Sequence, residues 1–225
     1  MTGTAEEAMS LNGTINKTGL LLLICIATAA WAWDSPAMQG PALYGALFGG
    51  FIVSIIAMFM PRTSPYLAPL YAALEGLVLG AITQVFNRYY HGIAINAILL
   101  TFSVLGLFLV LYATRIVKVT NGMRAAVVAA TLSIFVVYMI DIVLGFFGMS
   151  APFIHSTGIL GIGLSLVICG IAAFNLFLDF DAIERNVESR SPKYMEWYCG
   201  MALLITLVWL YLEILRLLSK LQSRR

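Results

Sequence analysis

Long apolar runs, separated by short breaks that contain charged residues, Pro or Gly, fill most of the chain. A helix needs about 20 apolar residues to cross the hydrocarbon core of a bilayer, so runs of this length predict membrane-spanning helices. The predicted spans cover residues 18–33, 42–60, 67–86, 93–113, 124–148, 157–178 and 196–218. The first run is short, and the pattern lets it extend back to Leu11. The pattern therefore predicts an all-α fold, a polytopic bundle of seven transmembrane helices.

Composition supports a single membrane domain. Of the 225 residues, 61% are hydrophobic and 11% are charged. A soluble domain carries about 25% charged residues, so a soluble fold is excluded. We expect a polar N-terminal segment (1–17), a transmembrane domain (18–218) and a basic C-terminal tail (219–225). The formal net charge of +2 comes from scattered Lys and Arg residues, which argues against a nucleic-acid partner.

The distribution of Lys and Arg predicts the orientation, because cytoplasmic connections carry an excess of both. One face collects Lys17, Arg62, Arg115, Lys118, Arg124, Arg185, Arg190 and Lys193. The opposite connections hold only Arg88, which places the N-terminus in the cytoplasm. The tail departs from this count, since these bases would lie outside if the last segment crosses: Arg216, Lys220, Arg224 and Arg225. Either the rule fails at the tail or the last segment re-enters; we keep seven crossings, because earlier helices mainly set the orientation.

Two glycine pairs have the GxxxG spacing that lets helix backbones approach closely. The pairs are Gly45 with Gly49 and Gly76 with Gly80. We predict that both serve helix packing in the bundle, with a gating hinge as the alternative.

Acidic side chains inside the predicted spans are the main functional candidates. Glu75 and Asp141 lie mid-span without a basic neighbour in sequence. An ionised group at the centre of a spanning helix costs about 2.5 to 3.5 kcal/mol on insertion scales, so such acids usually face the bundle interior and mark ion pathways. The alternative is a protonated acid that serves packing alone.

Further acids lie at the end of the sixth span and in the seventh. Asp179 is the better interior candidate there, because Asp181 precedes Arg185 by four residues and is expected to pair with it at the interface. Glu213 precedes Arg216 by three residues on one helix face, which makes Arg216 a candidate counter-charge.

These segments resemble the Bax inhibitor-1 family, also called the transmembrane Bax inhibitor motif family. The stretch from Glu75 to Gly80 is similar to its third-helix motif, Asp179 to Ile183 to the end of its sixth helix, and Leu210 to Glu213 to its closing motif. The chain has Glu213 where the family has Asp, and a longer interval before it. The extra segment 192–198 resembles a bacterial subgroup, which implies a multi-pass protein of the bacterial inner membrane.

The resemblance implies a pH-sensitive calcium leak in which two facing carboxyl groups share a proton and keep the pore closed. Two close carboxylates in a low-dielectric site cannot both ionise cheaply, so one retains a proton. We hypothesise that Asp179 and Glu213 form this gate and weak Ca²⁺ site, with Glu75 and Asp141 along the ion pathway. The alternative is that Arg216 neutralises Glu213, which would abolish the shared proton. Ca²⁺ is expected as the transported ion, and no cofactor is expected.

Two other classes of function remain open. A non-transporting regulator would bind other membrane proteins, with the charged connection from Glu184 to Glu196 as its contact surface. An intramembrane aspartyl protease would also use two facing acids, but the Gly-x-Gly-Asp signature expected near the second acid is absent from the sequence. We therefore expect a protein without enzymatic activity, whose surroundings are the lipid bilayer and its ions.

Overall fold

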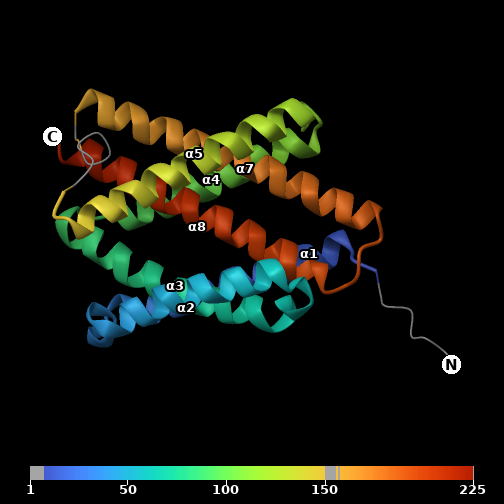
Figure 1. Cartoon of the computed structure of the whole chain (residues 1–225), viewed down its shortest axis with the longest axis horizontal. Coiled ribbons are helices and arrows are strands. Elements are labelled where there is room, and N and C mark those ends of the chain that lie inside the picture. Colours follow the sequence, from blue (N-terminus) through green and yellow to red (C-terminus); the bar gives the residue numbers. More distant parts are fainter. Residues whose placement is uncertain (1–7, 150–155, 157, 225) are drawn as a thin grey trace. The chain divides into compact units, whose positions relative to one another are not determined.

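A computed structural model describes residues 8–149, 156 and 158–224. Within these residues, seven helices are long and apolar enough to cross a membrane (Figure 1). With the labels of Figure 1 they are α1 (Leu11–Trp33), α2 (Pro41–Phe59), α3 (Ser64–Tyr89), α4 (Ile93–Ala113), α5 (Asn121–Phe146), α7 (Ile159–Glu188) and α8 (Met195–Gln222). Two short 3-10 helices, η1 (Pro36–Gln39) and η2 (Pro61–Thr63), precede α2 and α3. The predicted all-α fold with seven spans is confirmed.

Several helices extend beyond the apolar runs that predicted them. Helix α1 begins at Leu11 and so includes part of the predicted N-terminal segment, because the Ser10 side chain caps it by accepting a hydrogen bond from the Gly13 N–H at 3.0 Å. Helix α7 continues to Glu188, where an ion pair between Asp181 and Arg185 joins successive turns. Helix α8 includes part of the predicted tail. The length of an apolar run in the sequence shows only the part of a helix that lies in the hydrocarbon core of the bilayer.

The chain divides into two compact units, which are described separately. The first comprises Met1–Arg88 with Asp179–Ile205, and the second comprises Tyr89–Leu178 with Thr206–Arg225. One division falls at the end of α3, and the other two fall inside α7 and α8, so each of these two helices contributes one segment to each unit.

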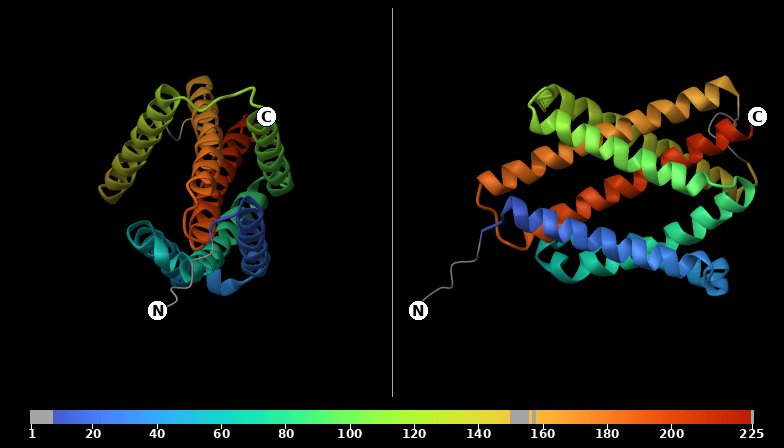
Figure 2. Two further views of the ribbon diagram at one scale, coloured as in Figure 1. Left: turned by 90° about the vertical axis from the view of Figure 1, so that its right-hand side faces the viewer. Right: turned by 180° about the vertical axis from the view of Figure 1, so that it is seen from behind.

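Close packing of α1 against α3 organises the first unit, and the right-hand view of Figure 2 shows the two helices crossing each other. A Cβ atom on Gly76 would lie 2.0 Å from the Thr28 hydroxyl oxygen, and one on Gly80 would lie 2.2 Å from the Ala29 carbonyl oxygen. Only glycine permits this approach, which confirms Gly76 and Gly80 as a packing pair.

The second glycine pair does not behave in the same way. A Cβ atom on Gly45 would meet no described atom within 4 Å, so the predicted packing role of Gly45 is wrong. The glycines of α2 that face α3 are instead adjacent in sequence: Gly49 lies over Leu74 and Gly50 lies over Glu75. GxxxG spacing shows that a backbone can be approached, but it does not show that a partner helix is there.

Aromatic packing and one polar contact join three helices in the second unit. Phe108 of α4 packs on Phe177 of α7 with ring centroids 4.6 Å apart, and edge-on against Phe174 at 5.8 Å. The Asn175 side-chain amide donates to the Thr131 hydroxyl of α5 at 2.9 Å. Helix α7 is thus fixed to both α4 and α5 in this unit.

Candidate functional site

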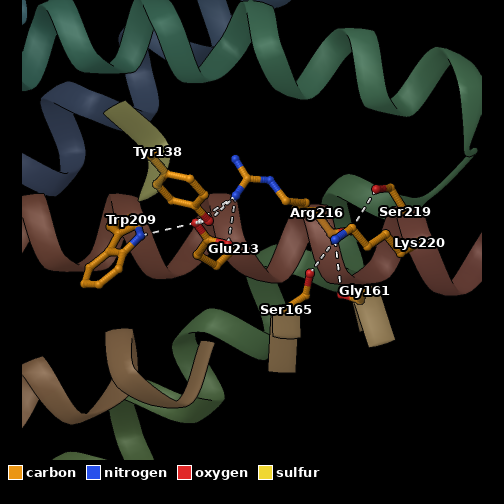
Figure 3. A network of polar contacts seen from close by, with 8 residues as sticks. All are labelled: Tyr138, Gly161, Ser165, Trp209, Glu213, Arg216, Ser219 and Lys220. Atoms are coloured by element: carbon orange, nitrogen blue, oxygen red, sulfur yellow. Dashed lines mark hydrogen bonds and ion pairs between the residues drawn. The ribbon is translucent and has the colours of Figure 1, made fainter. Parts of the chain in front are cut away.

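The most enclosed acid of the second unit is Glu213 on α8, which is only 1% exposed. Figure 3 shows its carboxylate surrounded by three donor side chains. Arg216 Nη1 lies 3.1 Å from both carboxylate oxygens. The Tyr138 hydroxyl donates to Oε1 at 2.7 Å, and Trp209 Nε1 donates to the same oxygen at 3.2 Å. We call these four residues the Glu213 cluster.

Sequence spacing places two of the three donors on the face of Glu213. Trp209 lies four residues before Glu213 and Arg216 three residues after it, so all three share one face of α8. Tyr138 comes from α5 and also accepts a hydrogen bond from Arg216, while its ring lies 4.9 Å from the guanidinium carbon. The arrangement fits an ionised carboxylate, since a buried charge is tolerated when it is paired and hydrogen-bonded.

A second base of the predicted tail is bound one turn further along α8. Lys220 is 6% exposed, and its Nζ donates to the Ser165 hydroxyl at 2.8 Å and to the Gly161 carbonyl at 3.2 Å, both on α7 (Figure 3). Arg216 and Lys220 are therefore held by protein groups. The count of Lys and Arg that predicts the orientation applies to solvated connections, so these two residues should be omitted from it. Helix α8 forms one continuous helix from Met195 to Gln222.

In the first unit, Glu75 lies half-buried on α3. Tyr71, one turn earlier, is hydrogen-bonded to its carboxyl group. A Cβ atom on Gly50 would lie 3.6 Å from Glu75 Oε2, so the carboxyl group faces the α2 backbone at a glycine. The structure thus places the predicted pathway acid between α2 and α3.

The remaining predicted acids lie in different surroundings. Asp179 is on the α7 segment of the first unit, with one carboxylate oxygen fully buried. Because Glu213 belongs to the second unit, the pairing of Asp179 with Glu213 stays a prediction. Asp141 is half-buried on α5, and its pathway role also stays a prediction.

The predicted pair of Asp181 with Arg185 is confirmed, at 3.1 Å. Among the described residues, no group of three or more His, Cys, Asp and Glu side chains is arranged to hold a metal ion.

Sequence reasoning missed a second buried glutamate on α8. Glu196, 1% exposed, accepts from the Ser10 N–H at 2.9 Å and from the Ser10 hydroxyl at 3.0 Å, and forms an ion pair with Lys17. Lys17 also lies 5.5 Å from the ring centroid of Trp197. We call Ser10, Gly13, Lys17, Glu196 and Trp197 the Glu196 cluster. The pattern placed Glu196 at the boundary between a charged connection and the predicted last span, and nothing in the local sequence links it to Lys17.

Tyr138 was missed as well, because its contact with Glu213 joins helices that are far apart in sequence. The spacing of Trp209, Glu213 and Arg216 along the sequence was the available signal for the two donors on α8. It led to Arg216 but not to Trp209.

Comparison with known proteins agrees with the motifs and with the fold. No curated protein and no solved structure matched the chain. A family model described as Bax inhibitor 1 like matches residues 1–223, which is nearly the whole chain. The protein therefore belongs to the Bax inhibitor 1-like family of multi-pass membrane proteins.

Proposed function

We propose that this membrane protein is a pH-sensitive calcium leak whose gate is built around the carboxylate of Glu213. The observation that carries the proposal is the burial of this charge inside a spanning helix, at 1% exposure, with Arg216 as its ion-pair partner. Charged groups inside membrane spans are costly and commonly mark ion pathways. Glu75, hydrogen-bonded on α3, and half-buried Asp141 on α5 are proposed as further pathway acids.

Arg216 acts in this proposal as an internal counter-cation. Carboxylate oxygens are hard ligands that suit Ca²⁺, but a leak requires that they bind it only weakly. While Arg216 is bonded to both oxygens of Glu213, the carboxylate is occupied and the path is closed. Opening requires the guanidinium to withdraw. Asp179 is proposed as the second gate acid, and a proton that it shares with Glu213 gives a second closed state, which competes with the ion pair.

Calcium flux into proteoliposomes across a range of pH tests this gate. R216Q should raise the flux at neutral pH, because Glu213 loses its counter-cation. E213Q and D179N should lower the flux and flatten its pH dependence. D181N is the matched control, since Asp181 pairs at 3.1 Å with a half-exposed Arg185 side chain on the same helix as Asp179. Unchanged flux and pH profile in both E213Q and D179N would overturn the proposal.

We also propose that the N-terminus lies in the cytoplasm of a bacterial cell, with the protein in the inner membrane. The excess of Lys and Arg on one set of connections supports this orientation. In a variant without Cys25, Cys169 and Cys199, a cysteine replacing His91 should react with an external, membrane-impermeant maleimide. A cysteine replacing Lys193 should react only after permeabilisation. The reverse pattern would contradict the orientation.

A membrane regulator is the second candidate, and the ordering of the α7–α8 connection favours it. The Met9 N–H donates to the Ser191 carbonyl at 2.7 Å, which fixes this connection, while Arg190 and Lys193 stay exposed. An ordered charged surface of this kind suits another membrane protein. If R190S/K193S removes co-purified partners without changing calcium flux, the regulator is favoured; partners retained by that variant would count against it.

A further inference from the structure

One side chain of the Glu213 cluster belongs to a different helix from the others. Trp209, Glu213 and Arg216 are all on α8 and move with it, whereas Tyr138 is on α5. Its hydroxyl donates to Glu213 Oε1 at 2.7 Å and accepts from Arg216 Nη1, and its ring lies beneath the guanidinium at 4.9 Å (Figure 3). A single side chain therefore contacts both members of the ion pair and joins them to α5.

We propose that Tyr138 is the positioning residue of the gate, whose hydroxyl holds Glu213 and Arg216 together and couples their separation to the spacing of α5 and α8. This inference rests on the proposed calcium leak and names the element that controls its closed state.

The chemistry of the hydroxyl explains why a tyrosine suits this position. A phenol both donates and accepts, so it can bond an acid and a base simultaneously, which phenylalanine cannot do. Hydrogen bonds to charged groups are roughly twice as strong as neutral ones, and the apolar surroundings strengthen them further. When Glu213 binds a cation in place of Arg216, the cation competes with the Tyr138 hydroxyl for the carboxylate oxygen. The bond between α5 and α8 is then weakened in the same step that releases Arg216.

Other titratable groups act on Glu213 within the second unit. They include Lys220 on α8 and Cys169 on α7, in addition to Tyr138 and Arg216. Lys220 is bound by Gly161 and Ser165, while Arg216 bonds the carboxylate directly. Cys169 is a buried free thiol. Of these groups, Tyr138 is the one that bonds both Glu213 and Arg216.

The test compares Y138F with W209F in proteoliposomes. Y138F removes the hydroxyl and keeps the ring under Arg216, so the calcium leak at neutral pH should rise about tenfold, as expected for the loss of a hydrogen bond to a charged group. W209F also removes a donor to the same oxygen, but it leaves both Arg216 and the bond from α5 in place, so it should raise the leak less than Y138F does. In an R216Q background, Y138F should add little, because the pair it positions is already broken.

A spectroscopic readout separates positioning from general destabilisation. The infrared carboxyl bands that E213Q removes belong to Glu213, and Y138F should shift them, whereas W209F should shift them less. If E213Q alters the leak but Y138F changes neither the leak nor these bands, the Tyr138 proposal is overturned and the leak stands. If E213Q and D179N both leave the leak and its pH profile unchanged, the proposed function itself fails; unchanged Glu213 bands in Y138F would then overturn the positioning role independently.

Discussion

Helix α8 carries two glutamates that are equally buried, at 1% exposure each, but they are held in different ways. Glu196 bonds a backbone N–H and a hydroxyl at the start of α1, together with Lys17 from the same helix. Within the described part of the chain, the groups that bond Glu213 are side chains: Tyr138, Trp209 and Arg216. Side-chain donors can rotate away, while a backbone N–H cannot do so without moving its helix. Equal burial therefore does not imply an equal role.

The Glu196 cluster has the character of a fixed connection. Glu196 is in the first turn of α8, where a carboxylate also interacts favourably with the helix dipole. Its carboxyl group fills the space beside Gly13, where a Cβ atom would lie 2.2 Å from Oε1. The backbone on either side is bound too, through the hydrogen bond from Met9 to Ser191. We expect changes here to reduce stability, and changes at Glu213 to alter the leak.

The largest expected effect is that of G13A. The added methyl group would overlap the Glu196 carboxylate and displace it from Ser10 and Lys17, so unfolding should become easier by about 3 kcal/mol. Gly19 on the same helix is the matched control, because a Cβ atom there meets nothing within 4 Å. G19A should be neutral or slightly stabilising through helix propensity. Thermal unfolding in detergent measures both, and equal melting temperatures would show that the carboxylate moves without cost.

The next effect separates the two glutamates directly. E196Q should lower the free energy of unfolding by about 2 kcal/mol, since Lys17 loses a partly buried ion pair. The calcium leak of the folded fraction should not change. E213Q should instead affect the leak more than the stability, with a large change in the pH dependence of the leak. If E196Q alters the pH profile as much as E213Q does, the distinction between a fixed and a switching glutamate is wrong.

A double substitution sharpens the same distinction. Replacing both partners of a buried ion pair by apolar residues is often nearly neutral, whereas removing one partner leaves a charge unpaired. K17M/E196M should therefore recover most of the stability lost in E196Q, to within about 1 kcal/mol of the parent. Ser10 is exposed, so water can take up its N–H. The corresponding E213M/R216M protein should lose pH-dependent leak altogether. Equal leak in both double variants would contradict the proposed roles.

How far the sequence predicts this molecule depends on how far each contact reaches along the chain. The seven helices followed from run lengths, because the bilayer imposes one thickness on every span. The Glu213–Arg216 contact was also within reach, since it lies inside one helical turn. Tyr138 and Lys17 could not be assigned, because their partners are 75 and 179 residues away. Which helices face each other is set by packing, and residue types alone do not encode it.

The smallest expected effect concerns the cap of α1. Ser10 accepts from the Gly13 N–H at 3.0 Å and donates to Glu196, so S10A should cost about 1 kcal/mol of stability, the usual effect of losing an N-cap. Ser54 is the control, because its exposed hydroxyl donates to a carbonyl of its own helix, at 2.8 Å from Phe51 O. S54A should change the melting temperature very little. Because the Ser10 N–H still reaches Glu196, S10A should also retain the ion pair with Lys17. A loss in S10A as large as that in E196Q would instead mean that the serine hydroxyl, and not Lys17, fixes the carboxylate.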